Sequence, residues 1–318
     1  MDKKTFSLYI FSFHYDSKLQ GDIMFKSGFV TIIGEPNVGK STLLNSILKE
    51  KIAIVSPKPQ TTRNKIIGIL NQEDCQVIFI DTPGIHKSKN KLDEYMQDSV
   101  EHAVEGVDLV LLVLDGTRPF KKTELKLVEQ YDKDNTILVI NKVDESSYEQ
   151  LYPKLQMFNE LKNIKDIIPL SAKKGINVDV LVEIIKKHLH PGVKYFLNGE
   201  FTDKSERFLV SEAIREKILL LMQDEIPHGV AVDIIEYKEN KKLYTISADL
   251  ICERASHKKI LIGKDGEMLK KIGQLAREEI EKIVGTKVML KLFVKVRENW
   301  RNNKTYVNDF GYDSNELM

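Results

Sequence analysis

The sequence has few of the residues that mark secreted, zinc-binding or membrane-spanning proteins. Its 318 residues include only two cysteines, Cys75 and Cys252, which are far apart and belong to no Cys/His cluster. This scarcity argues against a disulfide framework and a zinc module, and it favours a reducing, cytoplasmic environment. The longest apolar run, Leu109–Leu114, has the length of a strand, whereas a membrane-spanning helix needs about 20 apolar residues.

An excess of charge of one sign is also missing. The formal net charge is +1, so any binding of nucleic acid must depend on local segregation of charge. With 42% hydrophobic and 30% charged residues, the composition is typical of a folded protein and excludes wholesale disorder. A chain of this length is too long for most single cores, so we expect about two domains.

Residues 26–190 alternate short β-branched segments with longer amphipathic ones. This pattern predicts an α/β domain whose mostly parallel sheet is covered by helices on both faces. Lys65–Leu70 and Gln76–Ile80 are too close in sequence for a crossover helix, so they should form an antiparallel hairpin and make the sheet mixed. The other expected strands are Phe29–Ile33, Leu109–Leu114, Thr136–Ile140 and Ile167–Leu170, and the expected helices are Lys40–Lys49, Lys91–Val104, Lys122–Tyr131 and Val178–Leu189.

Residues 1–25 are expected to be an N-terminal extension outside this fold. Lys3 and Lys4 precede a short apolar stretch that weakly imitates a signal peptide, but no small-residue cleavage site follows. The alternative, that these residues pack against the domain, stays open.

A second pattern follows an expected linker at residues 191–204. Residues 205–301 predict the order α-β-β-α-α-β if Ser256–Ile262 forms a short helix, and residues 302–318 are expected to be a C-terminal tail. Charge divides this half: residues 201–250 carry a net charge of −3 and residues 251–304 a net charge of +7. The other expected elements are the helices Ser205–Asp224 and Glu267–Val284 and the strands Val230–Tyr237, Leu243–Cys252 and Lys287–Val296.

A phosphate-binding loop lies between the first expected strand and the first expected helix. Its sequence has the spacing GxxxxGKS, and its glycines allow backbone N–H groups to turn toward phosphates. Lys40 is expected to reach the β- and γ-phosphates and Ser41 to bind Mg²⁺. The residues of this loop are Gly34, Glu35, Pro36, Asn37, Val38, Gly39, Lys40 and Ser41.

A second motif, Asp81, Thr82, Pro83 and Gly84, ends the strand Gln76–Ile80. A carboxylate at Asp81 can orient Mg²⁺, and the Gly84 N–H can bond a γ-phosphate. By itself the same sequence would be an ordinary β-turn.

A third motif, formed by Asn141, Lys142, Val143 and Asp144, indicates which base is bound. The Asp144 carboxylate only accepts hydrogen bonds, which suits the N1–H and N2–H₂ donors of guanine and leaves the carboxylate unpaired against adenine. Ser171 and Ala172 follow the next strand and complete the base pocket, with the Ala172 N–H directed at the guanine O6 atom. The motifs together predict a guanine-nucleotide site at the carboxyl edge of the sheet.

The second domain contains a GxxG loop formed by Gly263, Lys264, Asp265 and Gly266. Its position between two helical segments fits a KH domain of the prokaryotic type, in which this loop holds the backbone of a nucleic acid. Lys258, Lys259 and Lys270 are, with Lys264, the candidate phosphate contacts, although a solvated helix face would carry the same residues. Asp265 should weaken binding modestly. Trp300 could stack on a base or anchor the chain at the edge of the core.

These motifs, with the segment Gln60–Arg63 between the first two, resemble the Era family of GTPases from about Lys26 to Arg301. The resemblance implies an α/β fold, a Ras-like P-loop GTPase domain with a mixed sheet, followed by an α+β type II KH domain. It implies that Ser41, Thr62 and Asp81 hold Mg²⁺ and that Thr62 also meets the γ-phosphate, with Thr61 as the less favoured alternative to Thr62. The residues it implies for GTP hydrolysis are Lys40, Thr62, Gly84 and Asn37.

Two residues bear on how hydrolysis proceeds. Ile85 stands where many small GTPases carry a water-orienting glutamine, so intrinsic hydrolysis should be slow or use another route. Asn37 resembles the asparagine of potassium-stimulated relatives and suggests K⁺ as a second cofactor, although it could simply satisfy backbone groups of the loop.

The family resemblance also implies partners. We expect a monomer that binds the 3′ region of 16S ribosomal RNA and assists assembly of the small (30S) ribosomal subunit and maturation of its RNA. The alternative is a regulator of the cell cycle or growth that lies peripherally on the inner face of the cell membrane.

Overall fold

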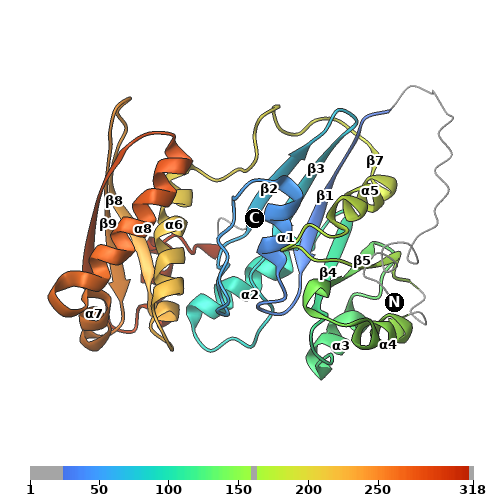
Figure 1. Ribbon diagram of the computed structural model, residues 1–318, viewed down its shortest axis with the longest axis horizontal. Coiled ribbons are helices and arrows are strands. Elements are labelled where there is room, and N and C mark those ends of the chain that lie inside the picture. The colour runs from blue at the N-terminus through green and yellow to red at the C-terminus, as the bar shows by residue number, and fades with distance from the viewer. Residues whose placement is uncertain (1–23, 159–162, 315–318) are drawn as a thin grey trace.

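The computed structural model describes residues 24–158 and 163–314 and shows two domains (Figure 1). Most of the expected N-terminal extension lies outside the described residues. No helix in the described ranges is both long and apolar enough to cross a bilayer.

The first domain is built on a mixed sheet in the order β2-β3-β1-β4-β5-β6, with β7 paired to the start of β1. β2 is antiparallel to β3, with Ile66 opposite Asp81, so the hairpin predicted from the short connection is confirmed. The pairs β3–β1, β1–β4, β4–β5 and β5–β6 are parallel. The strands are β1 (Lys26–Ile33), β2 (Ile66–Asn71), β3 (Cys75–Asp81), β4 (Leu109–Asp115), β5 (Thr136–Asn141), β6 (Asp166–Pro169) and β7 (His190–Pro191).

Helices cover both faces of this sheet, which explains why its central strands are continuous apolar runs. Along β4, Leu111 joins the core on one face and Leu112 the core on the other. Helices α1 (Lys40–Leu48) and α5 (Val178–His188) pack on the first face, and α2 (Lys91–Ala103), α3 (Lys122–Gln130) and α4 (Tyr148–Phe158) on the second. The parallel strands therefore all end at one edge of the sheet, where the nucleotide motifs lie.

Helix α4 is the longest described element of this domain that the sequence patterns did not predict. It contains Pro153, and a proline inside a helix removes a backbone donor and normally argues against helix. Burial of Leu151 and Phe158 against the core below explains why the helix forms nevertheless.

The second domain has the element order α-β-β-α-α-β that the sequence predicted. β9 pairs antiparallel with β8 and parallel with β10, and α6 and α8 pack together over one face of this sheet. The elements are α6 (Glu206–Leu221), β8 (Ala231–Lys238), β9 (Tyr244–Cys252), α7 (Ala255–Ile262), α8 (Glu267–Val284) and β10 (Val288–Val296).

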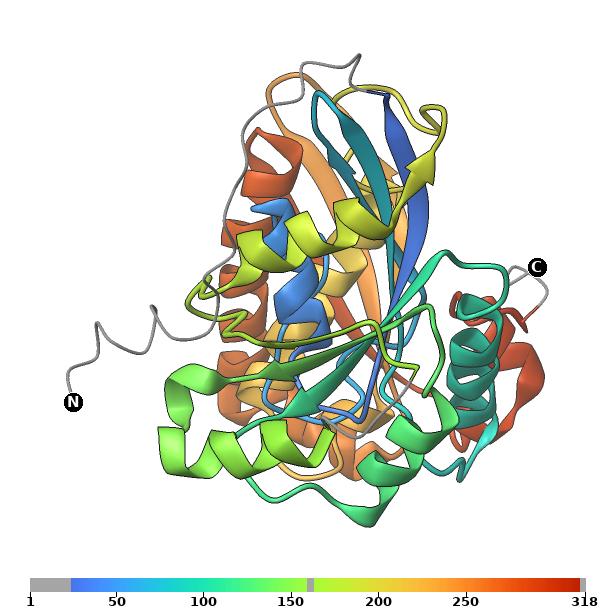
Figure 2. The same cartoon turned by 90° about the vertical axis from the view of Figure 1, so that its right-hand side faces the viewer.

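The C-terminal segment returns to the first domain. After β10 it forms α9 (Lys304–Asp309) and packs beside α2, as Figure 2 shows. Trp300 is fully buried and its Nε1 donates to the Gly229 carbonyl at 2.9 Å. Trp300 therefore anchors the chain in the core, and of its two interpretations base stacking is wrong.

Candidate nucleotide site and nucleic-acid groove

The phosphate-binding loop joins β1 to α1, and two of its glycines cannot be replaced without strain. Gly34 has φ = +148°, and a Cβ there would lie 2.4 Å from the Val113 carbonyl oxygen. Gly39 has φ = +98°, and its Cβ would lie 2.3 Å from the Asn141 amide nitrogen. Close packing of the loop against the ends of β4 and β5 therefore requires glycine at both positions.

Lys40 places its charge inside this loop. Its side chain is buried, and Nζ donates to the carbonyls of Gly34 and Glu35 at 3.1 Å each. Burial lowers the pKa of Lys40 to about 8, although the carboxylates of Asp81 and Glu35 act in the opposite direction. The loop thus surrounds one cationic group, as binding of a polyphosphate requires.

Three oxygen-bearing side chains from different elements meet next to Lys40. The Ser41 hydroxyl lies 2.6 Å from Asp81 Oδ2 and 2.7 Å from Thr62 Oγ1. Thr61 points elsewhere, because its hydroxyl donates to the Lys58 carbonyl at 2.7 Å. The structure therefore brings Thr62, and not Thr61, to Ser41 and Asp81.

This cluster fits a magnesium ion. Hydroxyl and carboxylate oxygens are the ligands that Mg²⁺ prefers, and Asp81 Oδ1 is buried without a hydrogen-bond partner in the described structure. Burial raises the pKa of Asp81 to about 6, against the opposing charge of Lys40 and the hydrogen bond from Ser41. A cation would remove this unfavourable burial of a carboxylate.

The turn after Asp81 packs directly on the phosphate-binding loop. A Cβ at Gly84 would lie 2.7 Å from Pro36, and the Ile85 N–H donates to the Gly34 carbonyl at 3.1 Å. The Ile85 side chain packs against the apolar core over α2 and α3. It therefore does not orient water in the site, as its apolar chemistry predicted.

His86, which the motifs did not single out, joins this turn to its neighbours. Its Nδ1 lies 2.7 Å from the Gly84 carbonyl oxygen, and its Nε2 lies 3.2 Å from Asp93 Oδ1. The hydrogen bond to Asp93 raises the pKa of His86 above its usual value despite partial burial. Gln60, just before Thr61, donates to the same Asp93 oxygen at 2.8 Å, so the turn and the segment before Thr62 share one cluster.

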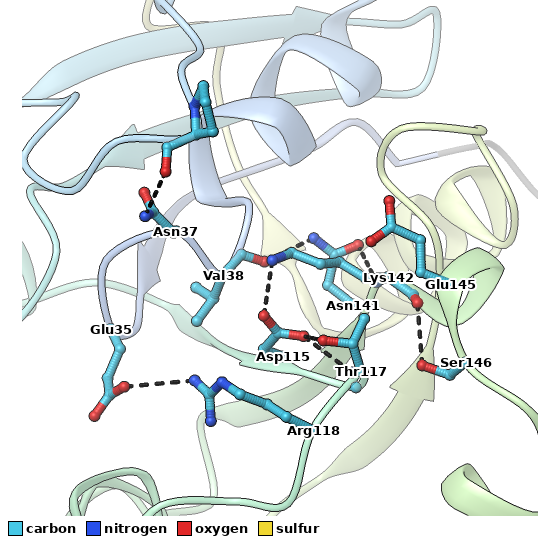
Figure 3. Close-up of polar contacts among 12 residues, drawn as sticks. Glu35, Asn37, Val38, Asp115, Thr117, Arg118, Asn141, Lys142, Glu145 and Ser146 are labelled. Carbon is cyan, nitrogen blue, oxygen red and sulfur yellow. Dashed lines mark hydrogen bonds and ion pairs between the residues drawn. The ribbon is translucent and has the colours of Figure 1, made fainter. Parts of the chain in front are cut away.

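Asn141 is the centre of the base-binding side (Figure 3). Its amide nitrogen donates to the Val38 carbonyl at 2.8 Å, and its oxygen accepts from the N–H groups of Lys142 and Ala172. The Ala172 N–H, which the sequence analysis directs at a guanine oxygen, donates to the Asn141 oxygen at 3.0 Å. Asp144 is exposed in a single 3₁₀ turn, Val143–Glu145, after β5.

In the second domain, the GxxG loop opens into a groove of about 550 Å³ between α8 and β10. Gly263 and Gly266 both have positive φ, and Lys264 and Asp265 between them are exposed. Among the predicted lysines Lys270 lines the groove, whereas Lys258 and Lys259 lie on α7 outside its lining. The lining residues include the cations Lys270 and Arg277 and the apolar Leu269, Leu290 and Leu292.

Comparison with known proteins agrees with both halves of this geometry. The model of the 50S ribosome-binding GTPase family matches residues 29–142, and the KH domain model matches residues 225–301. GTPase Era from Clostridium tetani is 50% identical over 293 residues, which cover 91% of this chain and 99% of that protein. The chain belongs to the Era family of GTPases.

Other members of the Era family agree. GTPase Era from Clostridioides difficile is 48% identical, with coverage of 91% and 99%. A crystal structure of Era with MgGDPNP and nucleotides 1506–1542 of 16S ribosomal RNA superposes with a TM-score of 0.87 and 38% identity. An Aquifex aeolicus Era variant bound to GDP·AlF4⁻ gives the same values, and each match covers 91% of this chain and 99% of the other. The expected family, its GTPase activity and the two-domain fold are confirmed.

This Era-family chain also has residues around the site that sequence reasoning missed, namely Lys121, Thr123 and Asp115. Glu35 of the phosphate-binding loop accepts from Lys121 at 2.8 Å and from Thr123. Although burial alone would raise the pKa of Glu35, these two hydrogen bonds lower it overall. Asp115 pairs with Lys142 at 2.7 Å and fixes the stem of that lysine. Only Asp115 had a sequence signal, because it ends a strand at the same sheet edge.

Proposed function

We propose that this GTPase is a nucleotide-controlled switch that binds the 3′ region of 16S ribosomal RNA and assists assembly and RNA maturation of the small ribosomal subunit. The observation that carries the proposal is one chain with both a guanine-type P-loop site and a basic GxxG groove. A relative of the same architecture binds nucleotides 1506–1542 of this RNA, which supports the same target here.

In this proposal each motif has one role in holding GTP. Lys40 and the N–H of Gly84 bind the phosphates, and the Asp144 carboxylate accepts from the guanine edge. Mg²⁺, which Ser41, Thr62 and Asp81 would hold, supplies positive charge beside the phosphates. The residues proposed to bind the nucleotide are Gly34, Glu35, Pro36, Asn37, Val38, Gly39, Lys40, Ser41, Asp81, Thr82, Pro83, Gly84, Asn141, Lys142, Val143, Asp144, Ser171 and Ala172.

The groove is suited to a single RNA strand. Lys264 and Lys270 provide charge for phosphates at the GxxG loop, and Leu269 and Leu290 provide an apolar floor for bases. β10 is at the edge of its sheet, so its backbone groups on that side are available to base edges.

Crosslinking followed by sequencing of the bound RNA tests this function. The protein is loaded with a non-hydrolysable GTP analogue in one sample and with GDP in the other. We expect enrichment at the 3′ end of 16S ribosomal RNA, stronger with the GTP analogue. Scattered recovery that is equal in both samples would contradict both the proposed target and the switch.

Potassium stimulation is a second expected property. The Asn37 amide nitrogen donates to the Pro57 carbonyl at 2.8 Å, which leaves its Oδ1 as the atom that a cation would take. Hydrolysis should be about tenfold faster in K⁺ than in Na⁺ at equal ionic strength, because a cation beside the phosphates stabilises developing charge. The matched variant is Asn37→Gly, since Asn37 has φ = +66° and glycine tolerates this conformation. It should remove the difference between the two salts, and equal wild-type rates would overturn the idea.

A further inference from the structure

The segment 60–63 touches the nucleotide site and the KH domain at neighbouring residues. Thr62 lies against Ser41 and Asp81, as described above. The next residue, Arg63, is only 1% exposed, and its guanidinium donates to backbone carbonyls of the KH domain. Two adjacent residues of the GTPase domain thus contact the nucleotide site and the KH domain respectively.

The Arg63 guanidinium is held by backbone carbonyls of one short stretch of the KH domain. Nη1 donates to the Val230 carbonyl and Nη2 to the His228 carbonyl, each at 2.8 Å. Tyr312 of the C-terminal segment adds its hydroxyl at 3.3 Å from Nη1, and its ring lies 5.9 Å from the guanidinium. These acceptors match the planar fork of arginine, and a lysine ammonium could reach only part of them.

Helix α6 of the KH domain holds the residues that precede Thr62. Arg215 on α6 donates to the Thr61 carbonyl, and Glu212 on the same helix fixes Arg215 through an ion pair of 2.6 Å. Further along, Glu216 accepts from the Val55 N–H at 3.1 Å and pairs with Lys51 at 2.8 Å. Figure 1 shows α6 on the side of the KH domain that faces the GTPase domain.

We propose that Arg63 is the positioning residue through which the KH domain holds Thr62 in the nucleotide site. A displacement of the KH domain then moves Thr62, and a nucleotide that fixes Thr62 restricts the KH domain. Because coupling between two sites is reciprocal, bound RNA must change the affinity for GTP by the same factor by which GTP changes the affinity for RNA. The RNA part rests on the proposed function, whereas the nucleotide part stands without it.

Arg63→Lys tests the proposal, because it keeps the charge and removes the fork. We expect binding of a GTP analogue in Mg²⁺ to weaken about tenfold and GDP binding to change less than twofold, since Thr62 is implied to meet the γ-phosphate. In the wild type, the GTP analogue and a 3′ 16S RNA fragment should each raise the affinity for the other about 5-fold or more. In the variant this coupling factor should be near 1. The matched control is Arg207→Lys, which alters an arginine–carbonyl contact within the KH domain. It should change neither the affinity for the GTP analogue nor the coupling factor.

Each outcome decides one question. A wild-type protein that does not bind the RNA fragment contradicts the proposed function, and the two nucleotide affinities still decide the role of Arg63. A folded Arg63→Lys variant with unchanged GTP-analogue affinity and unchanged coupling overturns the proposal. If that variant does not fold, Tyr312→Phe takes its place. Removal of one hydroxyl should weaken binding of the GTP analogue two- to threefold and lower the coupling factor two- to threefold. No change in either quantity overturns the proposal equally.

Discussion

Replacement of Asp144 by asparagine should lower the affinity for GTP at least about 100-fold and make the protein bind xanthosine triphosphate. A carboxylate accepts hydrogen bonds from both guanine donors, whereas an amide brings its own N–H₂ group against them. Xanthine carries an oxygen in place of the 2-amino group, so it pairs with the new donor. Sites built around such hydrogen bonds discriminate strongly against a mismatched partner.

Competition titration with both nucleotides against a fluorescent analogue measures this change. Glu145→Gln is the matched control, because Glu145 is in the same 3₁₀ turn but pairs with Lys173 at 3.2 Å instead. The control should keep its preference for GTP. An Asp144→Asn variant that still prefers GTP would show that another group reads the base.

The double variant Lys264→Glu with Lys270→Glu should bind the 16S RNA fragment at least about tenfold more weakly. Two cations at the GxxG loop and its groove become anions, which repel the RNA phosphates. Each lost phosphate contact should also reduce the slope of log affinity against log salt concentration by about one. Both side chains are exposed and neither is among the buried residues Ile272, Ala276 and Ile280 of α8, so folding should not change.

Affinity measured at several salt concentrations separates this effect from a loss of stability. Lys282→Glu is the control: it is on the same helix, outside the lining of the groove, and its side chain is 75% exposed. The double variant should bind GTP normally. RNA affinity and salt dependence equal to those of the control would contradict the assignment of the groove.

The fold was predictable where local pattern and loop length decide it. The β2–β3 hairpin followed from a connection too short for a helix, and the apolar strands followed from burial on both faces. Helix α4 was not predictable, because Pro153 weakens the local signal and the burial of Phe158 becomes apparent only once the sheet is assembled.

The candidate site likewise has features that the sequence could not predict. The choice between Thr61 and Thr62 could not be made from the residues, because both carry the same hydroxyl and only the path of the chain directs one to Ser41. The partners of Glu35 likewise come from the loop before α3 and from the helix itself, with no spacing that would have indicated them.

The sequence by itself determined that this protein binds a guanine nucleotide and carries a KH domain. Those properties lie in short motifs whose glycines, lysine and aspartate act through their own backbone freedom and hydrogen-bonding chemistry, wherever the rest of the chain lies. The tertiary structure alone decided how the two halves are joined. Arg63 meets Val230 from 167 positions away, and such a contact depends on which surfaces two folded domains present to one another rather than on any local pattern.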